Sequence, residues 1–238
     1  MQPTDAMTDR DTVDAQYART DNLRTRRDVW GPGPEGVSPT EVLVSSVVAA
    51  RPAKVIEIGC GTGHFARSVI DALPDVDYLA TDISAAMVEA TSSLGVPSRQ
   101  VPGDALPFAD DTFDGAVAAW MLYHVPDLDG TLAELRRVLR DGGRLSVATN
   151  GEEHLGDLLR EAGGEPVASQ FTAENAEEAL SRHFEHVSRR DVETRATFPD
   201  HAAAVAYLST FAADLAAALP HFEGPRAYVG RSCILTAH

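Results

Sequence analysis

The chain has 238 residues, of which 44% are hydrophobic and 24% are charged, and this composition excludes a wholly disordered chain, a collagen and a coiled coil. The length fits one domain with additions, or at most two, and is sufficient to bury a sizeable core. The 36 acidic residues outnumber the 20 basic ones, and a chain with a net charge of −16 makes a poor general nucleic-acid binder, although a local basic patch could still exist.

The location of the protein is predicted from its thiols and its apolar runs. Two cysteines, Cys60 and Cys233, are too few for a disulfide framework in a chain of this length. Residues 1–16 are polar and acidic, and they lack the basic and apolar regions of a signal peptide. No apolar run approaches the roughly 20 residues that span a bilayer. We therefore expect a cytoplasmic protein with no membrane partner.

The N-terminal part of the chain is expected to precede the main domain. Residues 17–30 have the pattern of a short amphipathic helix, and the Pro/Gly-rich residues 31–36 interrupt it. We therefore predict an N-terminal lid or helical segment over residues 1–36 and one domain over residues 37–238.

Helices and strands alternate through the middle of the chain. A helix over 38–50 begins with Ser38 as N-cap, Pro39 at the first helical position and Glu41 to complete a capping box. Hydrophobic periodicity then predicts strands at 54–59, 77–82, 98–105, 113–121 and 144–150, with helices at 64–73, 84–95 and 127–143. Such alternation is typical of βαβ units, which right-handed crossovers assemble into a doubly wound α/β fold with a parallel sheet.

The last third of the sequence has a different pattern. We predict helices at 154–164, 172–184 and 200–219, and strands at 186–198 and 228–237. The Ala-rich helix lies between the last two strands, so residues 199–224 are either a cover for a substrate or a helix that only packs.

A glycine-rich turn follows the first strand of the alternating region. Gly59, Gly61 and Gly63 allow a sharp turn and a close approach of a ligand to the main chain, and the helix that follows offers free N–H groups. A dinucleotide fingerprint requires a third glycine at the position of His64, so that fingerprint fails. A nicotinamide-dependent dehydrogenase is therefore disfavoured.

Two acidic residues indicate which ligand the turn accepts. Asp82 ends the second strand, about 20 residues after the turn, where a carboxylate can bind both hydroxyls of a ribose. Glu57 adds negative charge where a pyrophosphate would already be anionic. The turn therefore suits a nucleoside that carries a positive or zwitterionic group.

Five segments resemble the class I S-adenosylmethionine-dependent methyltransferases, most closely the small-molecule branch with the ubiquinone and menaquinone biosynthesis enzymes. They occur in the family's order and spacing, at residues 55–66, 78–84, 103–108, 113–127 and 135–150. The resemblance implies a Rossmann-like, mostly parallel sheet with an antiparallel last strand and helices on both faces. It also implies an enzyme that transfers a methyl group from S-adenosyl-L-methionine to an O or N atom of a small molecule, such as a secondary metabolite, and releases S-adenosyl-L-homocysteine.

The resemblance implies a cofactor site with methionine, ribose and adenine sides. The glycines and Glu57 would surround the methionine moiety, and Asp82 would hold the ribose. Trp120 departs from the small or polar residue of the family, so it either closes the cofactor pocket or shapes the substrate side. The residues assigned to this site are Tyr17, Glu57, Gly59, Cys60, Gly61, Gly63, Asp82, Ile83, Met87, Asp104, Ala105, Leu106 and Trp120.

Several of these assignments have an alternative. Tyr17 either lies across the cofactor or sits on a surface helix. Cys60 is interpreted as a small filler, because a nucleophilic thiol needs an electropositive setting and Glu57 has the wrong sign. His124 follows the fourth strand and suits a general base, with Tyr123 as a substrate contact, although both also fit a packing role. No spacing of His and Cys indicates a metal site.

Competing functions are left open by the sequence. A methyltransferase acting on RNA or protein would need a basic groove beside the cofactor, and a non-catalytic cofactor sensor would bind without turnover. An acidic pocket would favour an amine as the acceptor. We expect a small-molecule substrate, no nucleic-acid partner, and either a monomer or a homodimer.

Overall fold

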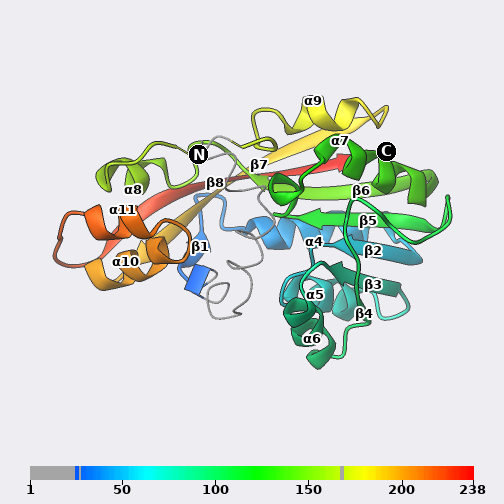
Figure 1. Cartoon of the computed structure of the whole chain (residues 1–238), viewed down its shortest axis with the longest axis horizontal. Coiled ribbons are helices and arrows are strands. Elements are labelled where there is room, and N and C mark those ends of the chain that lie inside the picture. The colour runs from blue at the N-terminus through cyan, green and yellow to red at the C-terminus, as the bar shows by residue number, and fades with distance from the viewer. Residues whose placement is uncertain (1–24, 27, 167–168) are drawn as a thin grey trace.

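An eight-stranded sheet lies at the centre of the computed structural model, which describes residues 25–26, 28–166 and 169–238 (Figure 1). The strands are ordered β1-β7-β8-β6-β5-β2-β3-β4 across the sheet. Their bounds are β1 (Trp30–Pro32), β2 (Lys54–Ile58), β3 (Asp77–Asp82), β4 (Ser98–Gln100), β5 (Phe113–Ala119), β6 (Leu139–Asn150), β7 (Val187–Phe198) and β8 (Arg226–Ala237).

Strand direction confirms the predicted fold class. β2 pairs in parallel with β3 and β5, β3 with β4, and β5 with β6, whereas β8 is antiparallel to both β6 and β7. The fold is therefore a Rossmann-like, mostly parallel sheet with an antiparallel last strand. The carboxyl ends of β2, β3, β5 and β6 meet at one side of the sheet, called here the carboxyl edge, where ligands of such folds bind.

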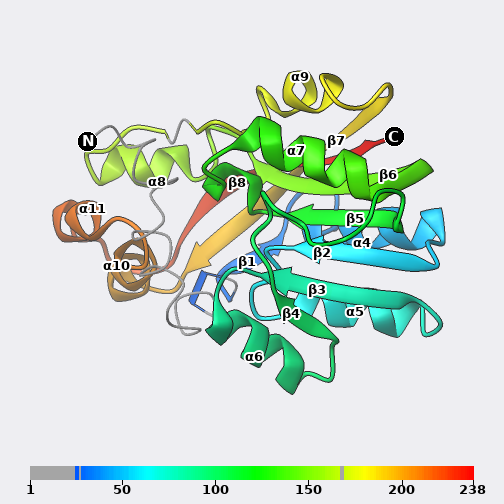
Figure 2. The ribbon, with the colours of Figure 1, turned by 45° about the vertical axis from the view of Figure 1, so that its right-hand side comes forward.

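Helices cover both faces of the sheet (Figure 2). Buried residues of α7 and α9 pack on one face with Ile56 and Ala118, and buried residues of α4 and α5 pack on the other with Val55 and Val117. The helices are α4 (Pro39–Ala50), α5 (His64–Ala72), α6 (Ala85–Ser93), the 3-10 turn η1 (Leu122–His124), α7 (Leu128–Val138), α8 (Gly156–Glu161), α9 (Ala176–Ser181), α10 (His201–Ser209) and α11 (Ala213–Ala218).

The start of α4 follows the sequence prediction. The Ser38 hydroxyl accepts a hydrogen bond from the Glu41 N–H at 3.1 Å, and the Glu41 carboxylate accepts one from the Ser38 N–H at 2.8 Å. This capping box satisfies two donors that the first turn of a helix leaves unpaired.

A long hairpin extends the sheet beyond the carboxyl edge. The pairing of β6 with β8 ends at Asn150 and Ser232, so residues 226–231 of β8 pair only with the end of β7. We call residues 193–231, which include α10 and α11, the arm. Together with α8, the arm encloses its own hydrophobic cluster, which contains the fully buried Phe198 and Leu208, at one end of the molecule (Figure 1).

Most of the helix predicted over 17–30 lies outside the described residues, and the structure corrects only its C-terminal end. Residues 25–26 are helical, but Trp30–Pro32 form β1, which pairs antiparallel with Thr194–Ala196 of β7. The Trp30 ring packs over the backbone of Gly230, where an added Cβ would lie 2.2 Å from it. Tertiary pairing with the arm therefore overrides the local helical pattern.

Other predicted elements are shorter or divided. The helix predicted over 127–143 ends at Val138, because β6 already begins at Leu139, opposite Phe113. The helix predicted over 200–219 is broken into α10 and α11. At the break, the guanidinium of Arg26 donates to both the hydroxyl and the carbonyl of Thr210. The strand predicted over 98–105 ends at residue 100, and the helices at 154–164 and 172–184 are reduced to α8 and α9.

Within the described ranges, no helix is both long and apolar enough to cross a membrane.

The cluster of the arm generates a stability prediction. Phe198→Ala removes a fully buried ring and should lower the free energy of unfolding by about 3–5 kcal/mol. Phe211→Ala is the matched control, because Phe211 lies at the α10–α11 turn with 38% of its surface exposed, and it should cost less than about 1 kcal/mol. Urea denaturation measures both variants, and equal losses would show that the cluster does not stabilise the arm.

Candidate cofactor site

The glycine-rich turn after β2 has a backbone that side chains would obstruct. Gly59, Gly61 and Gly63 adopt φ of 65°, 55° and 76°, in the left-handed region that favours glycine. A Cβ on Gly59 would lie 2.7 Å from Cβ of Met121, and one on Gly63 would lie 2.7 Å from the Thr91 hydroxyl oxygen. The three glycines therefore form a narrow turn, with Met121 and Thr91 packed against it.

Asp82 connects the glycine turn to the end of the next strand. Its Oδ2 accepts a hydrogen bond from the Gly61 N–H and its Oδ1 accepts one from the Ser84 N–H, both at 2.9 Å. The residue is only 9% exposed, so these donors stabilise a charge that has little contact with water. These two hydrogen bonds from the backbone fix the orientation of the carboxylate.

The residues assigned to the adenine side lie near Asp82 or on the next loop. Ile83 is 36% exposed, one of two large hydrophobic side chains that the described part of the chain leaves exposed, whereas Met87 is 1% exposed. On the loop after β4, Asp104 is half-buried, Ala105 is exposed and Leu106 is buried. Ile83 is thus available for contact with a flat apolar ring, and Met87 is mostly part of the core.

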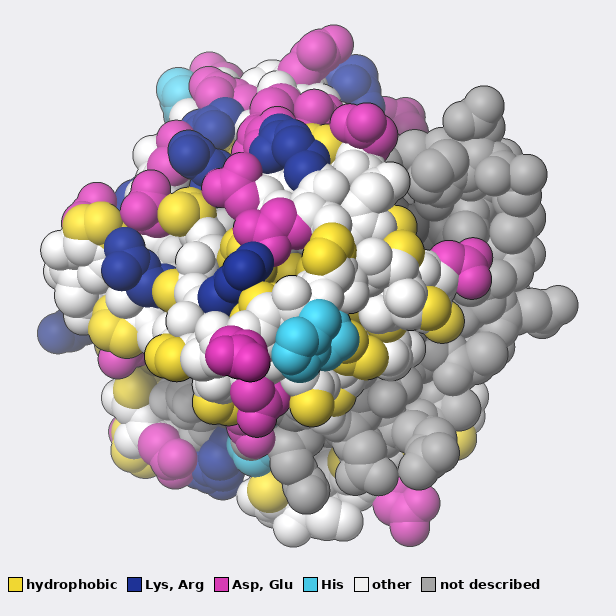
Figure 3. Space-filling model, turned by 90° about the vertical axis from the view of Figure 1, so that its left-hand side faces the viewer, with side chains coloured by type: hydrophobic (Ala, Val, Ile, Leu, Met, Phe, Trp, Pro, Cys, Tyr) yellow, Lys and Arg dark blue, Asp and Glu magenta, His cyan; other side chains and the backbone are white. Residues whose placement is uncertain are grey.

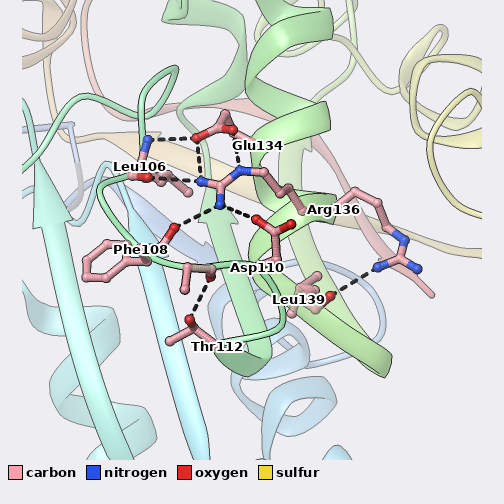
Figure 4. A network of polar contacts seen from close by, with 9 residues as sticks. Leu106, Phe108, Asp110, Thr112, Glu134, Arg136 and Leu139 are labelled. Atoms are coloured by element: carbon pink, nitrogen blue, oxygen red, sulfur yellow. Dashed lines mark hydrogen bonds and ion pairs between the residues drawn. The ribbon is translucent and has the colours of Figure 1, made fainter.

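A charged pair on α7 fixes the loop that carries Asp104. Figure 4 shows Leu106, Phe108, Asp110 and Glu134 converging on one guanidinium, which belongs to Arg137. The guanidinium donates to the carbonyls of Leu106 at 3.0 Å and Phe108 at 2.8 Å, and the Glu134 carboxylate accepts from the Leu106 N–H at 2.9 Å. Glu134 therefore binds a backbone N–H of the loop, and Arg137 binds two of its backbone carbonyls.

Glu57 lies inside the protein beneath the glycine turn. It is 1% exposed, and its Oε2 accepts a hydrogen bond from the Tyr78 hydroxyl at 2.9 Å. Burial raises the pKa of Glu57 from 4.5 to about 8, although the Tyr78 hydrogen bond opposes that rise. Glu57 is thus neutral over much of the physiological range unless a cation approaches it.

Cys60 has the environment of a buried side chain that packs and does not react. It is 7% exposed, and burial and the nearby Glu57 raise the pKa of its thiol to about 12. Thiolate is the nucleophilic form of cysteine, so this environment disfavours covalent catalysis by Cys60.

Trp120 adopts a conformation that is unusual for a large side chain. Its φ is 53°, and its backbone N–H donates to the Ala148 carbonyl at 2.8 Å. The indole Nε1 donates to Oδ1 of Asn150 at 3.1 Å. The ring therefore lies at the carboxyl ends of β5 and β6. β5 is the neighbour of β2, the strand that leads into the glycine turn.

The candidate catalytic residues lie on η1, immediately after Met121. The rings of Tyr123 and His124 meet edge to face, with centroids 4.5 Å apart. Gln170 holds this turn from the other side, because its side-chain amide donates to the carbonyls of Val125 and Leu122. Both candidates are thus at the carboxyl edge.

Tyr17 lies outside the described residues. Asn150, Tyr78 and Thr91 were not predicted from the sequence, and neither was the pair Glu134 and Arg137. Only the i, i+3 spacing of Glu134 and Arg137 gave a signal, and it indicated a pair on a helix surface rather than a contact with a distant loop. The described ranges contain no group of three or more His, Cys, Asp or Glu side chains that could hold a metal ion.

The raised pKa of Glu57 predicts how stability depends on pH. The folded protein binds a proton that the unfolded chain releases near pH 4.5, so stabilisation is complete below that pH and is lost as pH rises toward 8. In this window the free energy of unfolding should fall by up to about 1.4 kcal/mol per pH unit relative to Glu57→Gln, which keeps an oxygen for Tyr78. Denaturant titrations between pH 5 and 8 measure this difference, and parallel curves for the two proteins would contradict it.

The Glu134–Arg137 pair generates a prediction about loop mobility. Arg137→Gln removes two donors to the backbone of the loop, so the amides of residues 104–106 and 108 should exchange with solvent at least tenfold faster, which corresponds to about 1.4 kcal/mol. Arg136→Gln is the control on the same helix, because Arg136 donates to the Leu139 carbonyl instead. Hydrogen exchange read by mass spectrometry distinguishes them, and equal protection in both variants would show that Arg137 does not hold the loop.

Comparison with known proteins gives the site a family. Residues 56–147 match the model of a methyltransferase domain. The chain is 35% identical over 112 residues to a malonyl-[acyl-carrier protein] O-methyltransferase of Methylococcus capsulatus, covering 45% of this chain and 41% of that protein. It is 34% identical over 95 residues to a demethylmenaquinone methyltransferase of Corynebacterium urealyticum, covering 40% of each.

The similarity to solved structures extends over more of the chain. The YcgJ protein of Bacillus subtilis superposes with a TM-score of 0.61 at 18% identity, over 82% of this chain and 97% of that one, which shows a shared fold. The chain spans about two-fifths of the length of the two curated relatives named above. Residues 56–147, the strand order and the glycine turn are therefore similar to those of methyltransferase domains.

Proposed function

We propose that the protein transfers a methyl group from S-adenosyl-L-methionine to an O or N atom of a small molecule. The observation that carries the proposal is the Asp82 carboxylate, which two backbone N–H groups orient at the carboxyl edge between the glycine turn and the exposed Ile83. A carboxylate suits ribose hydroxyls, an apolar side chain suits an adenine, and a glycine turn admits the chain that joins them to sulfur. Secondary metabolites are the class of acceptor to screen first.

The bound cofactor supplies a methyl group on a positively charged sulfur. In the proposed reaction the acceptor atom forms a bond to the methyl carbon, the C–S bond breaks, and the electron pair stays on sulfur. Positioning of donor and acceptor in a site without water can supply much of such a rate enhancement. The glycine turn would bring the donor close to the backbone, and Met121 would support that turn from behind.

A proton leaves the acceptor when a hydroxyl or an ammonium group is methylated. His124 is the candidate to receive it, because it lies on η1 at the carboxyl edge and an ordinary imidazole titrates near neutral pH. Tyr123 would contact the substrate beside it. Glu57 is the candidate partner for the ammonium group of the cofactor, since an approaching cation favours the charged form of a buried carboxylate.

The alternatives are an RNA or protein methyltransferase and a protein that binds the cofactor without turnover. On the end of the molecule formed by α8, α10 and α11, the described side chains in Figure 3 are a mixture of acidic, basic and hydrophobic ones, with no continuous basic surface among them. Together with the net charge of −16, this favours a small molecule over a nucleic acid.

Calorimetric titration with S-adenosyl-L-homocysteine tests the cofactor assignment. Asp82→Asn replaces one carboxylate oxygen by a donor and should weaken binding at least tenfold. Asp77→Asn, at the exposed start of the same strand, should leave the affinity within about twofold of the wild type, because Asp77 pairs only with Lys54 across 3.5 Å in the described structure. Binding of NAD, with no binding of S-adenosyl-L-homocysteine, would overturn the proposal.

Activity is tested separately, with methyl-labelled S-adenosyl-L-methionine and a panel of hydroxyl and amine compounds. Transfer to a member of the panel supports the enzyme. Cofactor binding with no transfer to any of them would support the cofactor sensor.

A further inference from the structure

The carboxyl end of β6 carries a side-chain arrangement that the cofactor does not explain. Asn150 is the last residue of β6, and its Oδ1 accepts two hydrogen bonds, one from Trp120 Nε1 at 3.1 Å and one from the Ser232 hydroxyl at 2.9 Å. The three residues come from three different strands or strand ends, and they lie at the base of the arm. We call them the indole triad.

The backbone of Trp120 indicates that the triad is held against strain. A φ of 53° is rare for a bulky residue, and such backbone strain clusters at functional sites. Two hydrogen bonds to β6 maintain it, one from the backbone N–H to Ala148 and one from the indole to Asn150.

The indole also determines which way the Asn150 amide faces. An indole N–H can only donate, so the amide must turn its oxygen toward Trp120 and its Nδ2 away. The Ser232 hydroxyl donates to the same oxygen and reinforces this orientation. Within the described ranges, no residue accepts a hydrogen bond from Nδ2, so two N–H donors are presented at the carboxyl edge.

The place of the triad relative to the glycine turn favours the methyl acceptor as its ligand. β5 separates β6 from β2, and Met121, the neighbour of Trp120 in sequence, is the residue that packs against Gly59. A molecule against the indole would therefore lie beside the methionine end of the cofactor.

We propose that the indole triad is the acceptor subsite, in which the Asn150 Nδ2 donors bind a carbonyl-type oxygen of a planar acceptor that lies against the Trp120 ring. This inference rests on the proposed function and specifies its substrate class. An amide that presents donors selects oxygen acceptors and disfavours cations, so the local chemistry opposes the amine acceptor that the net charge alone would suggest.

The test uses the protein loaded with S-adenosyl-L-homocysteine and labelled with 5-fluorotryptophan. The chain contains two tryptophans, and the ¹⁹F resonance of Trp120 is assigned by its loss in Trp120→Phe. The probes are benzoate, benzamide and benzylamine, which share one ring and present a carboxylate, a neutral carbonyl and a cation. Benzoate or benzamide should shift the Trp120 resonance and leave that of Trp30 in place, and benzylamine should bind at least tenfold more weakly.

Asn150→Asp is the decisive variant, because it keeps the oxygen for Trp120 and Ser232 and replaces the two donors by a second oxygen. The unliganded Trp120 resonance should stay near its wild-type position. The affinity for benzoate or benzamide, whichever the wild type binds, should fall at least tenfold. Ser232→Ala leaves Nδ2 in place and should change that affinity less than about threefold.

Each result has a defined meaning. Equal affinity of wild type and Asn150→Asp for benzoate and benzamide, or preference of the wild type for benzylamine, would overturn the subsite while the cofactor assignment stands. Failure of the wild type to bind S-adenosyl-L-homocysteine would overturn the cofactor assignment, and the subsite with it.

Discussion

The Asp82 carboxylate is the contact on which the geometry of the site depends. Its two oxygens bind backbone N–H groups of the turns that follow β2 and β3, and its own backbone carbonyl accepts from the Val101 N–H after β4 at 3.0 Å. One residue thus fixes three consecutive connections at the carboxyl edge. Because the partners are main-chain donors, their positions depend on the register of the parallel strands more than on neighbouring side chains. The cofactor side is consequently set by the sheet itself.

The side of the site next to the arm, where Trp120 and Asn150 lie, is constructed differently from the side that Asp82 fixes. The arm has a hydrophobic cluster of its own, separate from the two clusters on the faces of the parallel sheet. It joins the rest of the sheet where the pairing of β6 with β8 ends. Substitutions in the cluster of the arm can therefore leave the packing of the glycine turn undisturbed.

Local patterns were sufficient to predict the fold, and they are also the basis of the proposed cofactor site. The capping box of Ser38 and Glu41, the spacing of the three glycines and the position of Asp82 all lie within short stretches of sequence. The fold class they indicated is confirmed, and residues 56–147 match the model of a methyltransferase domain. The sequence did not predict contacts between distant residues. Thr91 against Gly63, Asn150 on Trp120, and Arg137 on the loop of Leu106 join residues 28 to 31 positions apart, and no periodicity reports such pairs. The strand at Trp30–Pro32 was missed for the same reason, because its pairing partner is in the arm.

The two outermost strands of the described sheet have a consequence for self-association. β1 and β4 are each three residues long, and β1 ends in Pro32, which cannot donate to a further ladder. On the other side Arg99 places an exposed charge along β4. Short, charged or proline-containing borders give an incoming chain few main-chain groups to pair with. Twelve-residue strands such as β7 and β8 would be efficient templates for aggregation, and here both lie inside the sheet, where they pair with each other along their whole length. Their other edges are covered only in part, at Thr194–Ala196 of β7 by β1 and at Ser232–Ala237 of β8 by β6.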